Sequence, residues 1–209
     1  MIATFWCASL LLAPSTAAQD GAALLRDVQQ TYDALESLQA SFTQTVTSDF
    51  SRDTTRMEGR LVLKESKYRV ETEAQVLVTD GTTSWVYTPA DSQVVVNNAE
   101  RDPSTLSPET FFTDYAERYD VADTRSARHN GTPHAVLTLT PKESDTLFED
   151  VTLWVRTGDR IVTRLQVTDR NGSTITINLQ DIQLNPSLSD SVFQFDPPAN
   201  VEVVDLRAG

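Results

Sequence analysis

Cysteine is nearly absent from this chain, whose single example is Cys7. Cys7 lies in a short apolar segment, Phe5 to Ala13, that is followed by the small residues Ser15 to Ala18. This pattern is typical of an export signal, and we expect cleavage after Ala18. Residues 1–18 are therefore predicted to be a signal peptide and residues 19–209 to form one domain. The mature domain has no thiol, which excludes disulfides, thiolate metal sites and cysteine nucleophiles.

Lysine, glycine and long apolar runs are also scarce. Three lysines are present among seventeen basic residues, which face thirty acidic residues and leave a net charge of −13. A surface of this sign repels a phosphate backbone, so nucleic acid is not an expected partner. Seven glycines and nine prolines are too few for a collagen-like or linker-rich chain. No apolar run reaches the roughly 20 residues that span a bilayer.

Motifs that carry catalysis are missing as well. The chain has no Gly-x-Ser-x-Gly, Walker, His-Glu-x-x-His or dinucleotide glycine motif. Its two histidines, His129 and His134, have no acidic residue beside them, and we expect surface positions rather than a metal site. Glu71 and Glu73 form a carboxylate pair of the kind that an acidic sequence produces by chance. The sequence predicts no catalytic residue, no metal and no cofactor.

Hydrophobic periodicity predicts two helices and many strands. Apolar residues recur every three or four positions after Asp20 and predict a helix from Gly21 to Gln39. A second helix is predicted from Ser107, with Pro108 in its first position. Alternation with period two predicts about eleven strands. These are Ser41 to Thr47, Arg56 to Lys64, Lys67 to Thr72, Val76 to Thr79, Thr83 to Thr88, Val94 to Asn97, Tyr119 to Ala127, His134 to Thr140, Phe148 to Thr157, Arg160 to Thr168 and Ser173 to Gln183.

Glycine-containing pairs separate several of these strands and predict hairpin turns. They are Asp80-Gly81, Asn130-Gly131, Gly158-Asp159 and Asn171-Gly172, and we expect a type I′ turn at the first pair. Short antiparallel strands in meander order, with one apolar face, must curl. The two amphipathic helices are then expected to pack against the concave apolar face.

Four segments carry a resemblance to a known family. The sequence Ala-Ser-Phe-Thr-Gln-Thr-Val-Thr occupies residues 40–47, and Asp-Gly-Thr-Thr-Ser-Trp-Val-Tyr-Thr-Pro occupies residues 80–89. Leu-Thr-Pro-Lys at 139–142 and Phe-Gln-Phe-Asp-Pro-Pro-Ala-Asn-Val at 193–201 follow in the same order. From Leu24 to Asp205 the chain resembles the periplasmic carriers of outer-membrane lipoproteins, the LolA family. The resemblance implies a mainly β fold: an unclosed, strongly curved antiparallel β-barrel covered by lid helices.

The resemblance also implies an apolar cavity for the acyl chains of a lipoprotein. Its wall would be formed by Phe42, Val46, Leu61, Leu63, Tyr68, Val70, Trp85 and Tyr87. Lid helices carrying Leu24, Val28, Tyr32, Phe111 and Phe112 would pack inward in the empty protein and swing away when acyl chains compete for the same surface. The alternative for the wall residues is an ordinary, fully packed core.

One position departs from the family pattern. Members commonly carry Arg-Pro at the end of the second strand, where the arginine bonds to lid backbone and helps to keep the closed state. Here Glu65 occupies the arginine position. Either Lys64 or Arg69 substitutes for it, or the lid is latched differently.

The function that the resemblance implies is a monomeric periplasmic carrier without enzymatic activity. Its partners would be lipid-modified lipoproteins, an inner-membrane transporter that releases them and an outer-membrane acceptor. Each CH₂ group removed from water contributes about 0.8 kcal/mol, so long acyl chains need a shield to cross the periplasm. Two alternatives from other classes are a lipoprotein-sensing module of envelope-stress signalling with the same half-barrel and a lipid-acting hydrolase.

Overall fold

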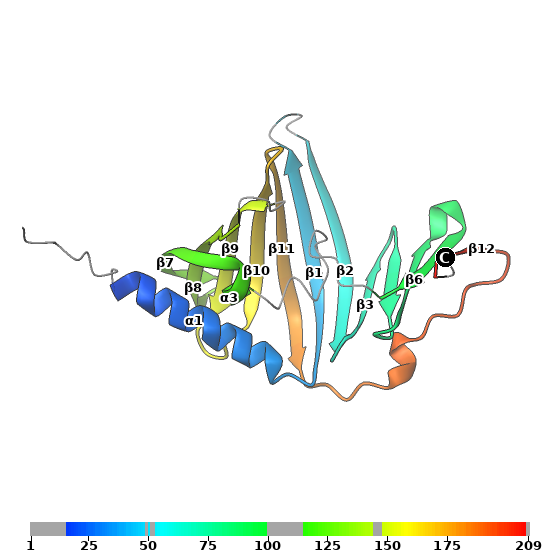
Figure 1. Cartoon of the computed structure of the whole chain (residues 1–209), viewed down its shortest axis with the longest axis horizontal. Coiled ribbons are helices and arrows are strands. Elements are labelled where there is room, and N and C mark those ends of the chain that lie inside the picture. The colour runs from blue at the N-terminus through cyan, green and yellow to red at the C-terminus, as the bar shows by residue number, and fades with distance from the viewer. Residues whose placement is uncertain (1–15, 49, 51–52, 100–114, 144–147, 208–209) are drawn as a thin grey trace, which may run out of the picture.

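The computed structural model describes residues 16–48, 50, 53–99, 115–143 and 148–207 (Figure 1). Helices are α1 (Thr16–Asp33) and α3 (Tyr115–Arg118), with 3₁₀ turns η1 (Pro89–Asp91) and η2 (Asp190–Phe193). The strands are β1 (Ser37–Ser48), β2 (Thr54–Lys64), β3 (Lys67–Thr72), β4 (Val76–Thr79), β5 (Thr83–Thr88), β6 (Gln93–Asn98), β7 (Tyr119–His129), β8 (Thr132–Pro141), β9 (Phe148–Arg156), β10 (Val162–Asp169), β11 (Ser173–Leu184) and β12 (Glu202–Asp205).

The strands of the described residues form one curved, unclosed sheet. Their order is β12-β6-β5-β4-β3-β2-β1-β11-β10-β9-β8-β7, so two meanders meet where β1 pairs with β11. All pairs are antiparallel except β12, which runs parallel to β6. The predicted mainly β fold is confirmed, and eleven of these twelve strands correspond to predicted segments. Strand β12 was not predicted, because Glu-Val-Val-Asp at 202–205 shows neither an apolar run nor an alternation of apolar and polar residues.

Helix α1 is shorter at its C-terminal end than predicted. The expected helix ran to Gln39, but α1 ends at Asp33 and β1 begins at Ser37. Leu38, which continues the helical spacing, instead pairs with Leu63 on one side and Leu184 on the other. Pairing on both sides of a central strand stabilises this segment more than one further helical turn would. Of the second predicted helix, only α3 falls within the described residues.

The turn between β4 and β5 differs from the predicted type. Gly81 has a φ of +90°, but Asp80 has no positive φ, so the type I′ prediction is wrong. The Asp80 carboxylate accepts hydrogen bonds from the backbone N–H groups of Thr82 and Thr83, both at 2.8 Å. These hydrogen bonds from the turn backbone to the aspartate side chain stabilise the turn, so the backbone of Asp80 does not have to adopt a positive φ. At Asn130 and Gly131 both φ angles are positive, as a type I′ turn requires.

The largest buried cluster lies between α1 and one face of the sheet, which we call the inner face. In Figure 1, α1 and α3 lie beside β7 to β10, and β3 to β6 lie away from both helices. Leu25 and Val28 of α1 belong to this cluster together with strand residues of β1, β2 and β8 to β11. The helix therefore covers only part of the inner face.

Candidate functional site

Strand register decides which side chains share the inner face. Residues paired across neighbouring strands point to the same side of a sheet. Leu61 pairs with Val70, Val70 with Leu77, Leu77 with Val86, and Val86 with Val95. Leu61 also pairs with Ala40 of the main cluster. An apolar row thus runs along the inner face from β1 to β6.

Burial divides the inner face into two halves. Beneath α1, the cluster residues of β8, β9 and β10 are fully buried, among them Leu137, Leu139, Val151, Leu153 and Leu165. In the other half, the side chains of Val70, Leu77, Val86 and Val95 are only half-buried. We call β2 to β6 of the inner face the open half and β7 to β10 the closed half. The open half presents a continuous apolar surface that the described residues cover only in part.

Six of the eight predicted wall residues lie on the inner face. Phe42 and Val46 are on β1, Leu61 and Leu63 on β2, and Tyr68 and Val70 on β3, and the register links them to one side. Their contact with a ligand remains a prediction.

Trp85 and Tyr87 lie on the opposite, outer face, so the prediction that they line the same wall is wrong. Trp85 pairs with Val78 and Tyr87 with Val76, whereas the inner-face residue of β5 is Val86. Period two alone could not separate the faces here, because β4 and β6, the two neighbours of β5, are apolar on both faces.

Phe42 is already engaged by its neighbour in β2. Phe42 pairs with Gly59, and its side chain is 8% exposed. A Cβ atom on Gly59 would overlap the Phe42 ring and the backbone oxygen of Glu71. The ring therefore covers a glycine that has no side chain of its own, as in other aromatic–glycine pairs of β-sheets. Phe42 is the most enclosed of the predicted wall residues on β1.

A C-terminal segment covers the outer face of β2 to β6. We call residues 185–205, which follow β11 and end in β12, the C-terminal strap (Figure 1). Phe193 of the strap is fully buried, and the ring of Phe195 lies 5.8 Å from that of Tyr87. Val78 and Val94 are also fully buried, although neither belongs to the inner cluster. The strap thus closes a second, smaller core on the outer face.

Both residues proposed to replace the family's arginine bind the strap. Lys64 Nζ donates to Asp190 Oδ1 at 2.7 Å, and Arg69 Nη1 donates to the backbone oxygen of Val192 at 3.3 Å. Hydrogen bonds from Lys64 and then from Lys67 hold the pKa of Asp190 below its usual value. These contacts face away from α1. Lys64 and Arg69 therefore hold the strap, and a latch from either residue to the predicted lid remains a prediction, because Phe111 and Phe112 lie outside the described residues.

The predicted lid residues of α1 lie in or beside the closed half. Val28 is 1% exposed, and Leu24 and Tyr32 pack against the same cluster. The hydroxyl oxygen of Tyr32 accepts a hydrogen bond from the backbone N–H of Val162 at 3.1 Å, and burial raises the Tyr32 pKa. Leu25, which was not among the predicted lid residues, is nearly as enclosed as Val28. Phe111 and Phe112 lie outside the described residues.

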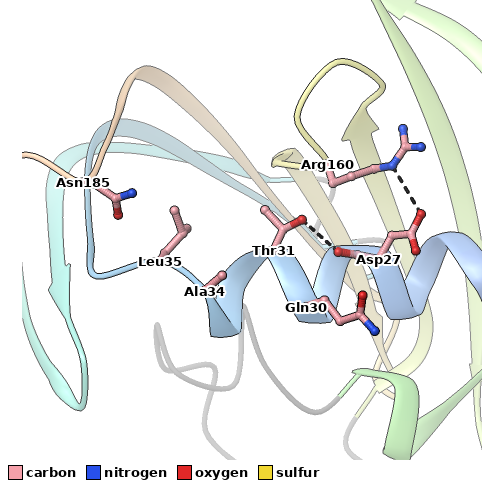
Figure 2. Close-up of a pocket in the computed structure, with 7 residues that line it drawn as sticks. All are labelled: Asp27, Gln30, Thr31, Ala34, Leu35, Arg160 and Asn185. Carbon is pink, nitrogen blue, oxygen red and sulfur yellow. Dashed lines mark hydrogen bonds and ion pairs between the residues drawn. The ribbon is translucent and has the colours of Figure 1, made fainter.

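A separate groove with a mixed lining lies at the C-terminal end of α1 (Figure 2). It has a volume of about 530 Å³ and is lined by Asp27, Gln30, Thr31, Ala34, Leu35, Arg160 and Asn185. Asp27 Oδ2 lies 3.6 Å from Arg160 Nε across the groove. A lining with an ion pair and two amides does not suit an acyl chain, because burying these groups without partners is unfavourable.

The two histidines differ in their surroundings. His134 is 3% exposed, so the predicted surface position is wrong for this residue. Its Nδ1 lies 2.9 Å from the backbone oxygen of Thr132, and its Nε2 lies 2.7 Å from Thr163 Oγ1. For His129, burial lowers the pKa, and Arg164 and His134 lower it further. Within the described residues, no cluster of three metal-ligating side chains is present.

An unclosed curved sheet with helices beside an apolar inner face defines the class of open β-barrel proteins with an apolar interior. The family described as outer membrane lipoprotein carrier protein LolA matches residues 33–196. The outer-membrane lipoprotein carrier protein of Alcanivorax borkumensis is 30% identical over 83% of each chain. That of Pseudomonas aeruginosa is 27% identical over 98% of each chain. The chain belongs to the LolA family.

Solved structures show the same fold at low sequence identity. An uncharacterized conserved protein from Thermus thermophilus aligns with a TM-score of 0.58 and 14% identity, over 90% of this chain and 99% of that chain. MucB aligns with a TM-score of 0.52 and 17% identity, over 89% of this chain and 66% of that chain. These likenesses extend the fold assignment without adding to the site.

Proposed function

We propose that this protein carries lipid-modified lipoproteins through the periplasm, from the inner to the outer membrane, with their acyl chains on the open half of the inner face. The observation that carries the proposal is the half-buried apolar row Val70, Leu77, Val86 and Val95 in a chain of the LolA family. The names of its relatives, outer-membrane lipoprotein carrier proteins, support the same cargo.

The physical basis is the shielding of hydrocarbon from water. When an acyl chain leaves a membrane, each CH₂ group that becomes exposed to water raises its free energy by about 0.8 kcal/mol. The open half offers apolar side chains from four neighbouring strands, and its cross-strand pairs leave no charged residue inside the row. Contact with this row would remove the CH₂ groups from water again and so offset most of that increase in free energy.

The transfer route and the partners belong to the same proposal. A releasing transporter in the inner membrane would load the carrier, and an outer-membrane acceptor would unload it. The carrier works as a monomer and makes or breaks no covalent bond, so exchange depends only on the relative affinities of the three sites for acyl chains.

A pair of matched variants tests the acyl site. Val70 and Val76 are half-buried valines on neighbouring strands but on opposite faces. In Val70→Gln, an amide without a partner would face the acyl chain, and we expect the Kd for cis-parinaric acid to rise about ten-fold. In Val76→Gln, the Kd should stay within about two-fold of the unsubstituted protein, because the change is on the outer face.

The binding assay is a fluorescence titration of the mature protein, repeated with a synthetic tripalmitoylated lipopeptide as competitor. Urea unfolding of both variants separates binding from stability. Failure of the unsubstituted protein to bind either probe would refute the proposed function. Equal losses of affinity in the two variants would refute the assigned face.

A further inference from the structure

We propose that α1 is a fixed anchor of the closed half, and that it stays docked when acyl chains bind to the open half. This inference rests on the proposed function, because it concerns how the same inner face receives acyl chains. It departs from the expectation that Leu24, Val28 and Tyr32 swing away with a lid.

The first observation is the close approach of α1 to β7 at Gly21. A Cβ atom on Gly21 would overlap Thr124 Oγ1 and Val121 Cγ1. The Thr124 hydroxyl is buried there and has no hydrogen-bond partner in the structure. The backbone of α1 at Gly21 thus lies directly against the side chains of Val121 and Thr124 in β7, and this close approach leaves no space for a larger residue at position 21. A cover that detaches repeatedly has no need for such close packing.

The second observation is the burial of the middle of the helix. Leu25 and Val28 are 3% and 1% exposed, and they belong to one cluster with Leu137, Leu153 and Leu165, which are fully buried. If α1 left the sheet, water would reach all of these side chains. An acyl chain on the open half would not cover them, because they lie on β8 to β10.

The third observation is a pair of polar contacts in the C-terminal half of α1. Tyr32 accepts the Val162 N–H at 3.1 Å, and Arg160 lies 3.6 Å from Asp27 (Figure 2). Both partners belong to the β9–β10 connection and the start of β10. Removal of α1 would leave the buried Val162 N–H without an acceptor, which is unfavourable in itself.

The connection between α1 and β1 is also held in place, at the first residues of the C-terminal strap. Asn185 Oδ1 accepts from the N–H groups of Glu36 at 2.9 Å and Ser37 at 3.3 Å. The Asn185 N–H donates to the Ser37 oxygen at 2.8 Å, and Ser37 Oγ donates to the Pro186 oxygen at 2.7 Å. A hinge at this corner would have to break these hydrogen bonds. Both ends and the middle of α1 are therefore held.

If α1 stays in place, the acyl chain must lie along the open half. Leu77, Val86 and Val95 then become contact residues, although sequence analysis did not select them. They continue the row from Leu61 and Val70 to β6. Their distance from α1 explains how cargo could bind without disturbing the closed half.

A wedge variant with a matched control tests the anchor. Gly21→Leu forces a side chain between α1 and β7, whereas Ala23→Leu adds the same side chain to an exposed position of the same helix. If α1 is an anchor, we expect Gly21→Leu to melt about 3 °C or more below Ala23→Leu. The Kd of both variants for cis-parinaric acid should agree within about two-fold. If α1 is a lid, the wedge favours the open state and should tighten binding about ten-fold.

Hydrogen exchange provides the second measurement. With a tripalmitoylated lipopeptide at saturation, amides of residues 20–33 should exchange at their unliganded rates, and those of β3 to β5 should exchange more slowly. Exchange in α1 that is about ten-fold faster with lipopeptide would overturn the anchor. Equal melting temperatures of the two leucine variants would also overturn it. Absence of probe binding would refute the proposed function alone, since the melting comparison needs no ligand.

Discussion

Removal of one strap side chain, in Phe193→Ala, should destabilise the protein without weakening acyl-chain binding. Phe193 is fully buried against the outer face, where Val78 and Val94 are also fully buried. Truncation of a fully buried phenylalanine costs about 3–5 kcal/mol, because it removes the transfer free energy of the ring and leaves a cavity. A domain of this kind has a total stability of about 5–15 kcal/mol, so the loss is a large part of the whole.

Equilibrium unfolding in urea measures this loss. With an m value of about 2 kcal/mol per M, the midpoint should fall by about 1.5–2.5 M at unchanged slope. Phe195→Ala is the matched control, since Phe195 is half-buried and touches Tyr87 at a ring distance of 5.8 Å. Its truncation should cost about 1–2 kcal/mol.

Two results would refute the reasoning. If Phe193→Ala is less destabilising than Phe195→Ala, the strap does not close a core on the outer face. If Phe193→Ala weakens the binding of cis-parinaric acid about ten-fold at a temperature where it is folded, the acyl chain does not lie on the opposite, inner face.

Two further predictions concern the open half and the strap. Gly59→Ala should lower stability by about 1–3 kcal/mol in urea unfolding, because its Cβ overlaps the Phe42 ring; wild-type stability would contradict the aromatic–glycine pair. Because Lys64 and Lys67 lower the folded pKa of Asp190, its contribution to stability is present above the unfolded carboxyl pKa of about 3.9. That contribution is lost as pH falls through the lower folded pKa. In Asp190→Asn, the midpoint of urea unfolding should therefore vary less with pH below about pH 4 than in the unsubstituted protein. An unchanged profile would show that the contact adds no stability.

The sequence by itself determined the secondary structure of most of the sheet and the family. The alternation that begins at Ser173 predicts β11, because Ile175, Ile177 and Leu179 share one face and the polar residues between them share the other. Asn130-Gly131 predicts its turn, because few residue pairs accept two positive φ angles. These are local properties of the chain, so no knowledge of distant contacts is required.

The tertiary structure decided which apolar face meets which partner. In Val76-Leu77-Val78 and Val94-Val95-Val96, both faces are apolar, so the sequence could not assign Trp85 and Tyr87 to the strap side. The spacing of Leu38 is compatible with a helix, and only its pairing with two strands shows that it belongs to the sheet. His134 is polar, yet it is buried beside Thr163. Burial, register and the course of the strap depend on contacts between residues far apart in sequence. Hydrophobic periodicity indicates that one face of a strand is apolar, but it does not indicate which other element of the fold covers that face.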